Sequence, residues 1–124
     1  MIELSDDKVF YAFDKEAPPA LRVSSGETVR IRTKDCFGNQ LQSANDTIDN
    51  IDWDAINPAT GPIYVEGAVA GGALKVKIEN IEFDAQSIAC TGEDEGVCGD
   101  RFDKWSLAVC PVTDEGVVWS DKLM

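Results

Sequence analysis

The sequence predicts an all-β fold, a sandwich or a barrel, with one short helix. Apolar and polar side chains alternate along several short segments, turn-forming residues separate these segments, and only one stretch has helical spacing. Alternation with a period of two is typical of a half-buried strand. Several short strands at such spacing are typical of sandwiches and barrels. We expect one domain over residues 1–124, because a chain of this length can bury a single core.

Three strands are expected before residue 35. Val9–Phe13 and Ala20–Val23 are short, rich in strand-forming residues and bounded by proline and glycine turn signals. Residues 28–34 alternate clearly, with Val29 and Ile31 on one face and basic residues at the positions between them. Segment 28–34 is therefore the best-defined strand of this part of the sequence.

Residues 43–56 are the exception to the β pattern. Ile48, Ile51 and Ala55 recur at helical intervals behind Ser43, a residue type that caps helix N-termini. One short helix is expected here.

Residues 74–83 predict one long, kinked strand. Leu74, Val76 and Ile78 alternate in one phase, and Ile81 and Phe83 follow in the opposite phase. A bulge or bend between the two sets would re-aim the strand.

The remaining strands are expected at Ile63–Glu66 and Ser87–Cys90, and in a C-terminal hairpin. Residues 105–109 alternate, Thr113–Gly116 offers a turn, and Val117–Trp119 returns along the first arm. The last strand leaves an open sheet edge, which predicts pairing with another chain, such as a homo-oligomer, or continuation in a longer protein.

Composition excludes several classes of function. The chain is 44% hydrophobic and 27% charged, which is typical of a globular protein. Its 11 basic and 23 acidic residues give a net charge of −12, which repels nucleic acids and anionic membrane surfaces. We expect neither as a partner.

The N-terminus has no signal-peptide pattern, and no segment is long and apolar enough to span a bilayer. A cytoplasmic location is expected, where the four cysteines would stay reduced. Their spacing does not predict a zinc site, and they are interpreted as buried small hydrophobes: Cys36, Cys90, Cys98 and Cys110.

Two polar segments stand where the backbone must turn: Asp35–Leu41, just past a strand, and Asn57–Ala68. A carboxylate followed closely by carboxamides can bind a cation or a small polar substrate. The same residue types can equally serve to satisfy backbone groups of a turn. Composition alone favours the turn interpretation.

These two segments, with four others in the same order, closely resemble signatures of the acetamidase/formamidase family. The matching segments are Tyr11–Asp14, Val23–Val29, Asp35–Leu41, Asn57–Ala68, Gly71–Val76 and Cys98–Asp100. The resemblance covers almost the whole chain and implies the N-terminal half of such an enzyme. It implies a jelly-roll-like β-sandwich, hydrolysis of short linear amides to a carboxylate and ammonia, and a bound divalent metal, zinc or calcium.

The resemblance also implies roles for particular residues. Asp35 and Glu66 match polar motif positions and become the candidates for metal ligand or general base. The positions that could orient substrate are Asn39, Gln40, Asn57 and Thr60.

One departure from the family limits this carry-over. The chain contains no histidine, whereas the family places metal-binding histidines in a C-terminal portion. A histidine-bearing partner or segment is therefore expected to complete the site. The alternative is a β-sandwich binding module that has lost the chemistry. A serine- or cysteine-nucleophile amidase is the weakest interpretation, since the sequence offers no histidine as base and no Gly-x-Ser-x-Gly motif.

Overall fold

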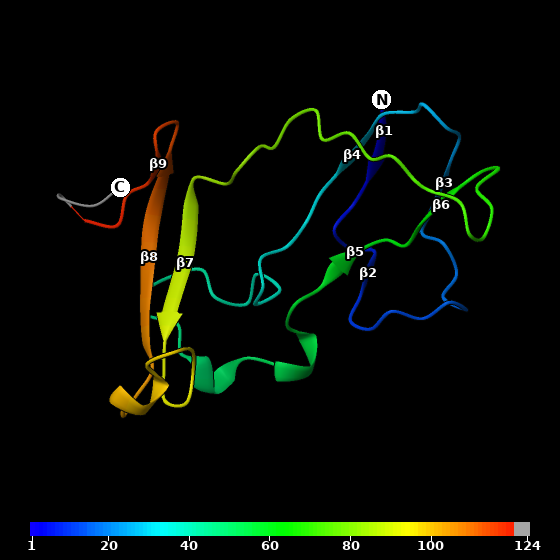
Figure 1. Cartoon of the computed structure of the whole chain (residues 1–124). Helices are drawn as coiled ribbons and strands as arrows, with labels where there is room; N and C mark the ends of the chain where they lie inside the picture. Colours follow the sequence, from blue (N-terminus) through cyan, green and yellow to red (C-terminus); the bar gives the residue numbers. More distant parts are fainter. Residues whose placement is uncertain (121–124) are drawn as a thin grey trace. The chain divides into compact units, whose positions relative to one another are not determined.

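A computed structural model describes residues 1–120 and confirms the predicted all-β class (Figure 1). Strands account for 28% of the chain and helix for 8%, so β-structure dominates. The chain divides into two compact units. The first unit is Met1–Gln40 with Asp52–Lys77, and the second unit is Leu41–Ile51 with Ile78–Met124. A single domain over 1–124 stays a prediction.

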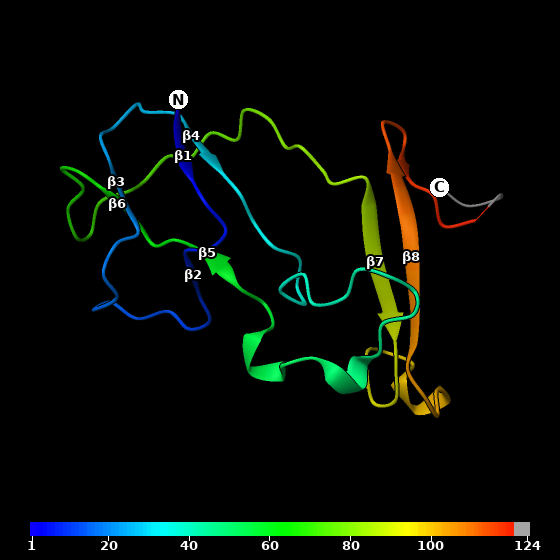
Figure 2. The ribbon, with the colours of Figure 1, turned by 180° about the vertical axis from the view of Figure 1, so that it is seen from behind.

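The first unit contains six short strands in three pairs and one 3-10 turn. Its elements are β1 (Ile2–Leu4), β2 (Val9–Phe10), β3 (Leu21–Val23), β4 (Val29–Ile31), η2 (Trp53–Ala55), β5 (Ala59–Thr60) and β6 (Ile63–Val65). β1 pairs with β4 and β3 with β6 in parallel, whereas β2 and β5 are antiparallel (Figures 1 and 2). Parallel partners cannot be joined by a tight hairpin, so distant parts of the sequence meet in each pair.

The core of the first unit is small. Leu4, Val23 and Phe37 are its buried hydrophobic side chains. Leu4 ends β1 and Val23 ends β3, so each parallel pair contributes one buried residue. Phe37 belongs to the loop after β4, and its buried side chain anchors that loop to the core.

The second unit is built on one antiparallel sheet in the order β7-β8-β9. Its elements are η1 (Ile48–Asn50), β7 (Gln86–Thr91), η3 (Gly99–Arg101), β8 (Ser106–Thr113) and β9 (Gly116–Val117). Thr113 pairs with Gly116, so the predicted C-terminal hairpin is confirmed. The buried hydrophobic residues of this unit are Leu41, Ile48, Ile51 and Cys110.

Two elements differ from the sequence-based prediction. Residues 43–56 form the two 3-10 turns η1 and η2 instead of one helix. Thr47 caps the first and Asp52 the second through their side chains. Side chains that bind nearby backbone N–H groups compete with a continuous helix, which explains the break. Residues 74–83 belong to no strand within residues 1–120.

The burial of the cysteines is corrected in part. Cys110 is buried and Cys90 is intermediate, but Cys36 and Cys98 are exposed. Both exposed cysteines lie in loops, where the alternation that predicts burial does not apply. No helix among the described residues is long and apolar enough to cross a membrane.

Candidate functional site

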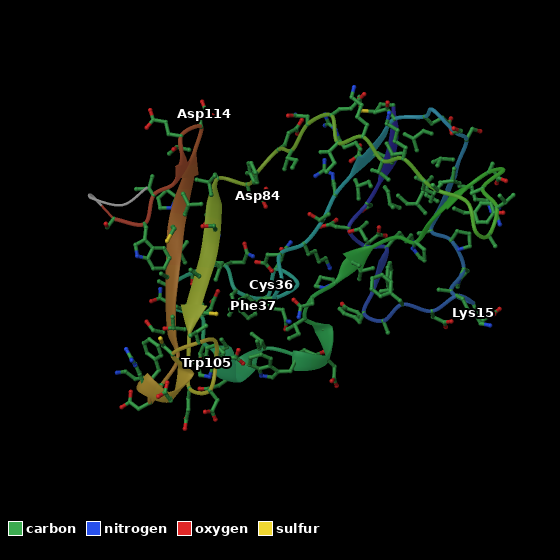
Figure 3. The ribbon with its side chains drawn as sticks, viewed as in Figure 1. Lys15, Cys36, Phe37, Asp84, Trp105 and Asp114 are labelled. Atoms are coloured by element: carbon green, nitrogen blue, oxygen red, sulfur yellow. The ribbon has the colours of Figure 1, made fainter. Side chains whose placement is uncertain are left out.

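Asp35 organises the loop that follows β4. Its Oδ1 accepts hydrogen bonds from the backbone N–H groups of Phe37 (3.0 Å) and Asn39 (2.7 Å). Asn39 Oδ1 accepts in return from the Asp35 N–H (3.0 Å), and Asn39 has a positive φ of 62°. Asparagine is among the few residues that adopt this conformation readily. The loop therefore holds the Asp35 carboxylate in one orientation. Cys36 and Phe37, the next two residues of this loop, are labelled in Figure 3.

The second oxygen of this carboxylate, Oδ2, accepts no hydrogen bond from the described residues. Asp35 as a whole residue is half-buried. A fixed carboxylate with one oxygen occupied and one available can accept a proton or bind an N–H group.

Gln40 ties the same loop to η2. Its Oε1 accepts from the Asp52 N–H (2.7 Å) and its Nε2 donates to the Asp52 carbonyl (3.1 Å). Asp52 in turn caps η2 by accepting from the Asp54 N–H (3.0 Å). The oxygen and the nitrogen of the Gln40 side-chain amide are thus both hydrogen-bonded to the Asp52 backbone, and these bonds hold the loop against η2. A substrate role for Gln40 stays a prediction.

Asn57 and Thr60 connect the second polar segment to the first. The Asn57 N–H donates to the Cys36 carbonyl (2.6 Å), and Asn57 has a φ of 53°. The Thr60 hydroxyl donates to the Arg32 carbonyl (2.8 Å). Asn57 therefore contacts the Asp35 loop through Cys36, whereas Thr60 contacts the chain at Arg32, before that loop.

Glu66 occupies a separate place in the first unit. Its N–H donates to the Val23 carbonyl (2.7 Å), and its Oε1 accepts from Arg22 Nη1 at 3.0 Å. The guanidinium of Arg22 lies over the Tyr64 ring, 4.3 Å from the ring centroid. Glu66 and Asp35 make no contact with each other in the described residues. Their joint role stays a prediction.

The described residues do not by themselves form a metal centre. Among residues 1–120 there is no group of three histidine, cysteine or acidic side chains that could hold an ion. Zinc and calcium sites usually take three or more ligands from the protein. Asp35 supplies one suitable oxygen, and Glu66 already binds a guanidinium.

The second unit contains a cavity of about 530 Å³ that the sequence did not predict. Its polar lining includes Asp46, Asp49 and Lys104, and Trp105 adds an aromatic wall (Figure 3). The backbone N–H groups of Gln42 and Ser43 bind Asp46 Oδ2 at 2.6 and 2.8 Å. These bonds hold the pKa of the Asp46 carboxyl below its ordinary value, so it carries a negative charge at neutral pH.

Sequence reasoning missed three groups of residues. Arg22 and Tyr64 are cross-strand partners in the β3–β6 pair, and the contact of Arg22 with Glu66 depends on that pairing. Asp52 was placed inside a helix, although an aspartate ahead of a short apolar run is a capping signal. The cavity residues are far apart in sequence and carry no spacing that could have revealed them.

Comparison with known proteins places the chain in a family. The model of the acetamidase/formamidase family matches residues 2–112. A Schizosaccharomyces pombe protein named as a formamidase is 36% identical over 70 residues, which are 54% of this chain and 17% of that protein.

Two solved structures are similar over nearly the full chain. One is described as an acetamidase/formamidase from Thermoanaerobacter tengcongensis, with 43% identity and a TM-score of 0.93 over 98% of this chain and 40% of that one. The other is an acetamidase from Bacillus halodurans, with 34% identity and a TM-score of 0.93 over 98% of this chain and 41% of that one. This chain therefore spans well under half the length of the relatives it matches, and it belongs to the acetamidase/formamidase family.

Proposed function

We propose that this chain supplies part of an amidase that hydrolyses short linear amides, of the formamide and acetamide type, to a carboxylate and ammonia. A second polypeptide or segment that bears histidines completes the enzyme. The observation that carries this proposal is 43% identity to a solved family member over 98% of this chain. The absence of histidine from the sequence and the 40% share of that relative's length support the need for a second part. We place the assembled enzyme in the cytoplasm.

Asp35 is the proposed general base. Hydrolysis adds water to the amide carbonyl carbon and breaks the carbon–nitrogen bond. One water proton must leave as the new carbon–oxygen bond forms, and the departing nitrogen must gain one. Asp35 Oδ2 can take the first proton and return it to nitrogen, while Oδ1 stays bound to the loop backbone. Asn39, which is hydrogen-bonded to Asp35, and Thr60, which is hydrogen-bonded to the Arg32 carbonyl, are proposed to orient the substrate or the loop.

The proposed metal, zinc or calcium, would take most of its ligands from the second part. The described residues do not form such a centre, so no step here is assigned to a metal. Glu66 can add one carboxylate oxygen, and Asp35 Oδ2 is the other candidate ligand, as the alternative to its role as base. For Glu66 this requires exchange of the Arg22 contact, which is exposed and therefore weakly held.

One observation favours the alternative, a non-catalytic binding module. The cavity of the second unit is large enough for a small ligand and has both charged and aromatic lining. A module of this kind would bind its ligand as the 124-residue chain alone and release no ammonia from amides.

The first prediction concerns Asp35→Asn in the assembled enzyme. Asparagine keeps an oxygen that can accept the Phe37 and Asn39 N–H groups, but it replaces the basic Oδ2 with an amide. Ammonia release from formamide and acetamide should fall at least about a hundredfold, a typical general-base effect. The rate of ammonia release would be measured by steady-state kinetics on the chain assembled with the histidine-bearing second part of the enzyme.

Asp14→Asn is the matched control. Asp14 Oδ1 also accepts a backbone hydrogen bond, from Glu16 at 2.9 Å, in an exposed turn of the same unit. This variant should keep wild-type turnover. Near-normal turnover of Asp35→Asn would contradict the assignment of Asp35 as base.

A further inference from the structure

The cavity of the second unit is lined by two segments that are far apart in sequence. Residues 44–49, which include the start of η1, contribute one part, and residues 104–107, around the start of β8, contribute the other. Its volume of about 530 Å³ falls within the range of small-molecule sites. All of these residues belong to the second unit, so the cavity shares no residue with the Asp35 loop of the first.

Trp105 is fixed in this lining by a glycine on the neighbouring strand. The β7–β8 ladder ends at the pair Thr91–Ser106, so Gly92 and Trp105 stand next in the same register. Gly92 is buried, and a Cβ at this position would collide with the indole ring. The ring therefore lies against the glycine, at the end of the sheet where β7 ends and β8 begins (Figure 3). A rigid aromatic surface is thus available to a ligand in the cavity.

The charged groups of the lining are of both signs. Asp46 is half-buried, and two backbone N–H groups hold its carboxylate in place. Asp49 accepts a hydrogen bond from the Thr47 hydroxyl at 3.2 Å. Lys104 is exposed and forms no ion pair with any residue that the structure describes. The lining therefore offers a ligand two oriented carboxylates and one ammonium group.

We propose that this cavity binds an α-amino acid with an apolar side chain. The ligand's ammonium group meets the carboxylates of Asp46 and Asp49, and its carboxylate meets Lys104. The ligand's side chain packs on the apolar part of the lining. That part consists of Ala44, Ile48, Trp105 and Leu107.

Simpler ligands match only part of this lining. An alkylamine brings a second cation to Lys104, and an alkyl carboxylate brings a third anion to the two aspartates. Like charges placed together weaken binding. A neutral amide pairs its dipole with charged groups but neutralises none of them. A ligand that carries both charges on one apolar body is therefore favoured, and this inference does not rest on the proposed amidase function.

The test is a titration of the ¹⁵N-labelled 124-residue protein, followed by amide chemical shifts. The probes are L-leucine, isopentylamine, which lacks the carboxylate, and 4-methylpentanoate, which lacks the ammonium group. L-Leucine should bind with a Kd below about 1 mM and shift resonances of residues 44–49 and 104–107. Each analogue should bind at least about tenfold more weakly, because one charged side of the cavity loses its partner.

Two variants test the two ends of the ligand separately. Lys104→Gln should weaken L-leucine at least about fivefold and leave isopentylamine equal or tighter, because a like charge is removed. Asp49→Asn should weaken L-leucine similarly and leave 4-methylpentanoate equal or tighter. Both side chains are exposed, so neither variant should shift thermal unfolding.

Asp103→Asn is the matched control. Asp103 is an exposed acid beside Lys104 in sequence, but it is outside the lining of the cavity. This variant should change the affinity for L-leucine by no more than about twofold.

Each of four results would overturn the inference. The first is no shift with L-leucine up to about 10 mM, and the second is a set of shifts outside the two lining segments. The third is equal affinity for L-leucine and either analogue, which would make the cavity a site for simple cations or anions. The fourth is unchanged affinity in both Lys104→Gln and Asp49→Asn.

Discussion

Asp35 and Glu66 carry the same charge in different surroundings. Asp35 is held by the N–H groups of its own loop, which leaves one oxygen available. Glu66 is held by the side chain of Arg22, which also stacks on Tyr64. A carboxylate bound by backbone keeps its place when a ligand arrives, whereas an exposed ion pair can open at little cost. We therefore regard Asp35 as the stronger catalytic candidate.

Glu66→Gln distinguishes a functional Glu66 from a structural one. The Arg22 and Glu66 side chains are 57% and 52% exposed, and exposed ion pairs contribute about 0–1 kcal/mol. The free energy of unfolding should therefore change by less than about 1 kcal/mol in urea denaturation. If Glu66 is a ligand or base, amide hydrolysis by the assembled enzyme should still fall about a hundredfold.

Arg22→Gln removes the same ion pair from the other side. It should match Glu66→Gln in stability but retain far more activity. Equal losses of activity in the two variants would mean that Glu66 acts only through the ion pair.

At the scale of elements, the Asp35 loop is positioned by its packing on η2. The Gln40 side chain donates one hydrogen bond to the Asp52 backbone and accepts another from it, and Gly38 lies close to the Ala55 carbonyl. A Cβ on Gly38 would stand 2.9 Å from that oxygen, and Gly38 has a φ of 66°. Glycine is needed here both for the backbone conformation and for the close approach.

Gly38→Ala should therefore destabilise the first unit more than a comparable glycine substitution. Gly26 has a φ of 89° with no atom within 4 Å of a built Cβ, so Gly26→Ala meets only the backbone penalty. That penalty is about 1–2 kcal/mol for a left-handed residue. Gly38→Ala should exceed it by about 1 kcal/mol or more, because backbone must move to relieve the contact. Equal free energies of unfolding for the two variants would contradict the proposed packing.

At the scale of the whole molecule, charge and exposed apolar surface oppose compact folding. The net charge is −12, and each unit buries only a few hydrophobic side chains. Like charges repel one another in the folded state, and small cores offset that repulsion only weakly.

Stability of the chain alone should rise with salt. Raising NaCl from about 20 to about 200 mM shortens the screening length from about 20 Å to about 7 Å, which weakens the repulsion among acidic residues. The midpoint of thermal unfolding, measured by circular dichroism, should increase by a few degrees. A neutral osmolyte at equal osmolality is the control. An unchanged or lower midpoint in salt would show that net charge does not limit stability.

The sequence by itself determined the β class, most strand positions and the family. Alternation in residues 28–34 and 105–109, together with the turn at Thr113–Gly116, contains this information locally. The strands observed at Val29–Ile31 and Ser106–Thr113 confirm it. It also marked Asp35 and its neighbours, because turn chemistry and motif order are properties of short segments.

Only the tertiary structure decided which segments meet. The parallel β1–β4 and β3–β6 pairs join strands that no hairpin links, and the second of them brings Arg22 to Tyr64 and Glu66. It was equally hidden that residues 74–83 form no strand within residues 1–120, since their alternation predicts a strand without naming its partner. Side-chain periodicity reports which face of a segment seeks burial, whereas the surface that buries it depends on contacts between residues distant in sequence.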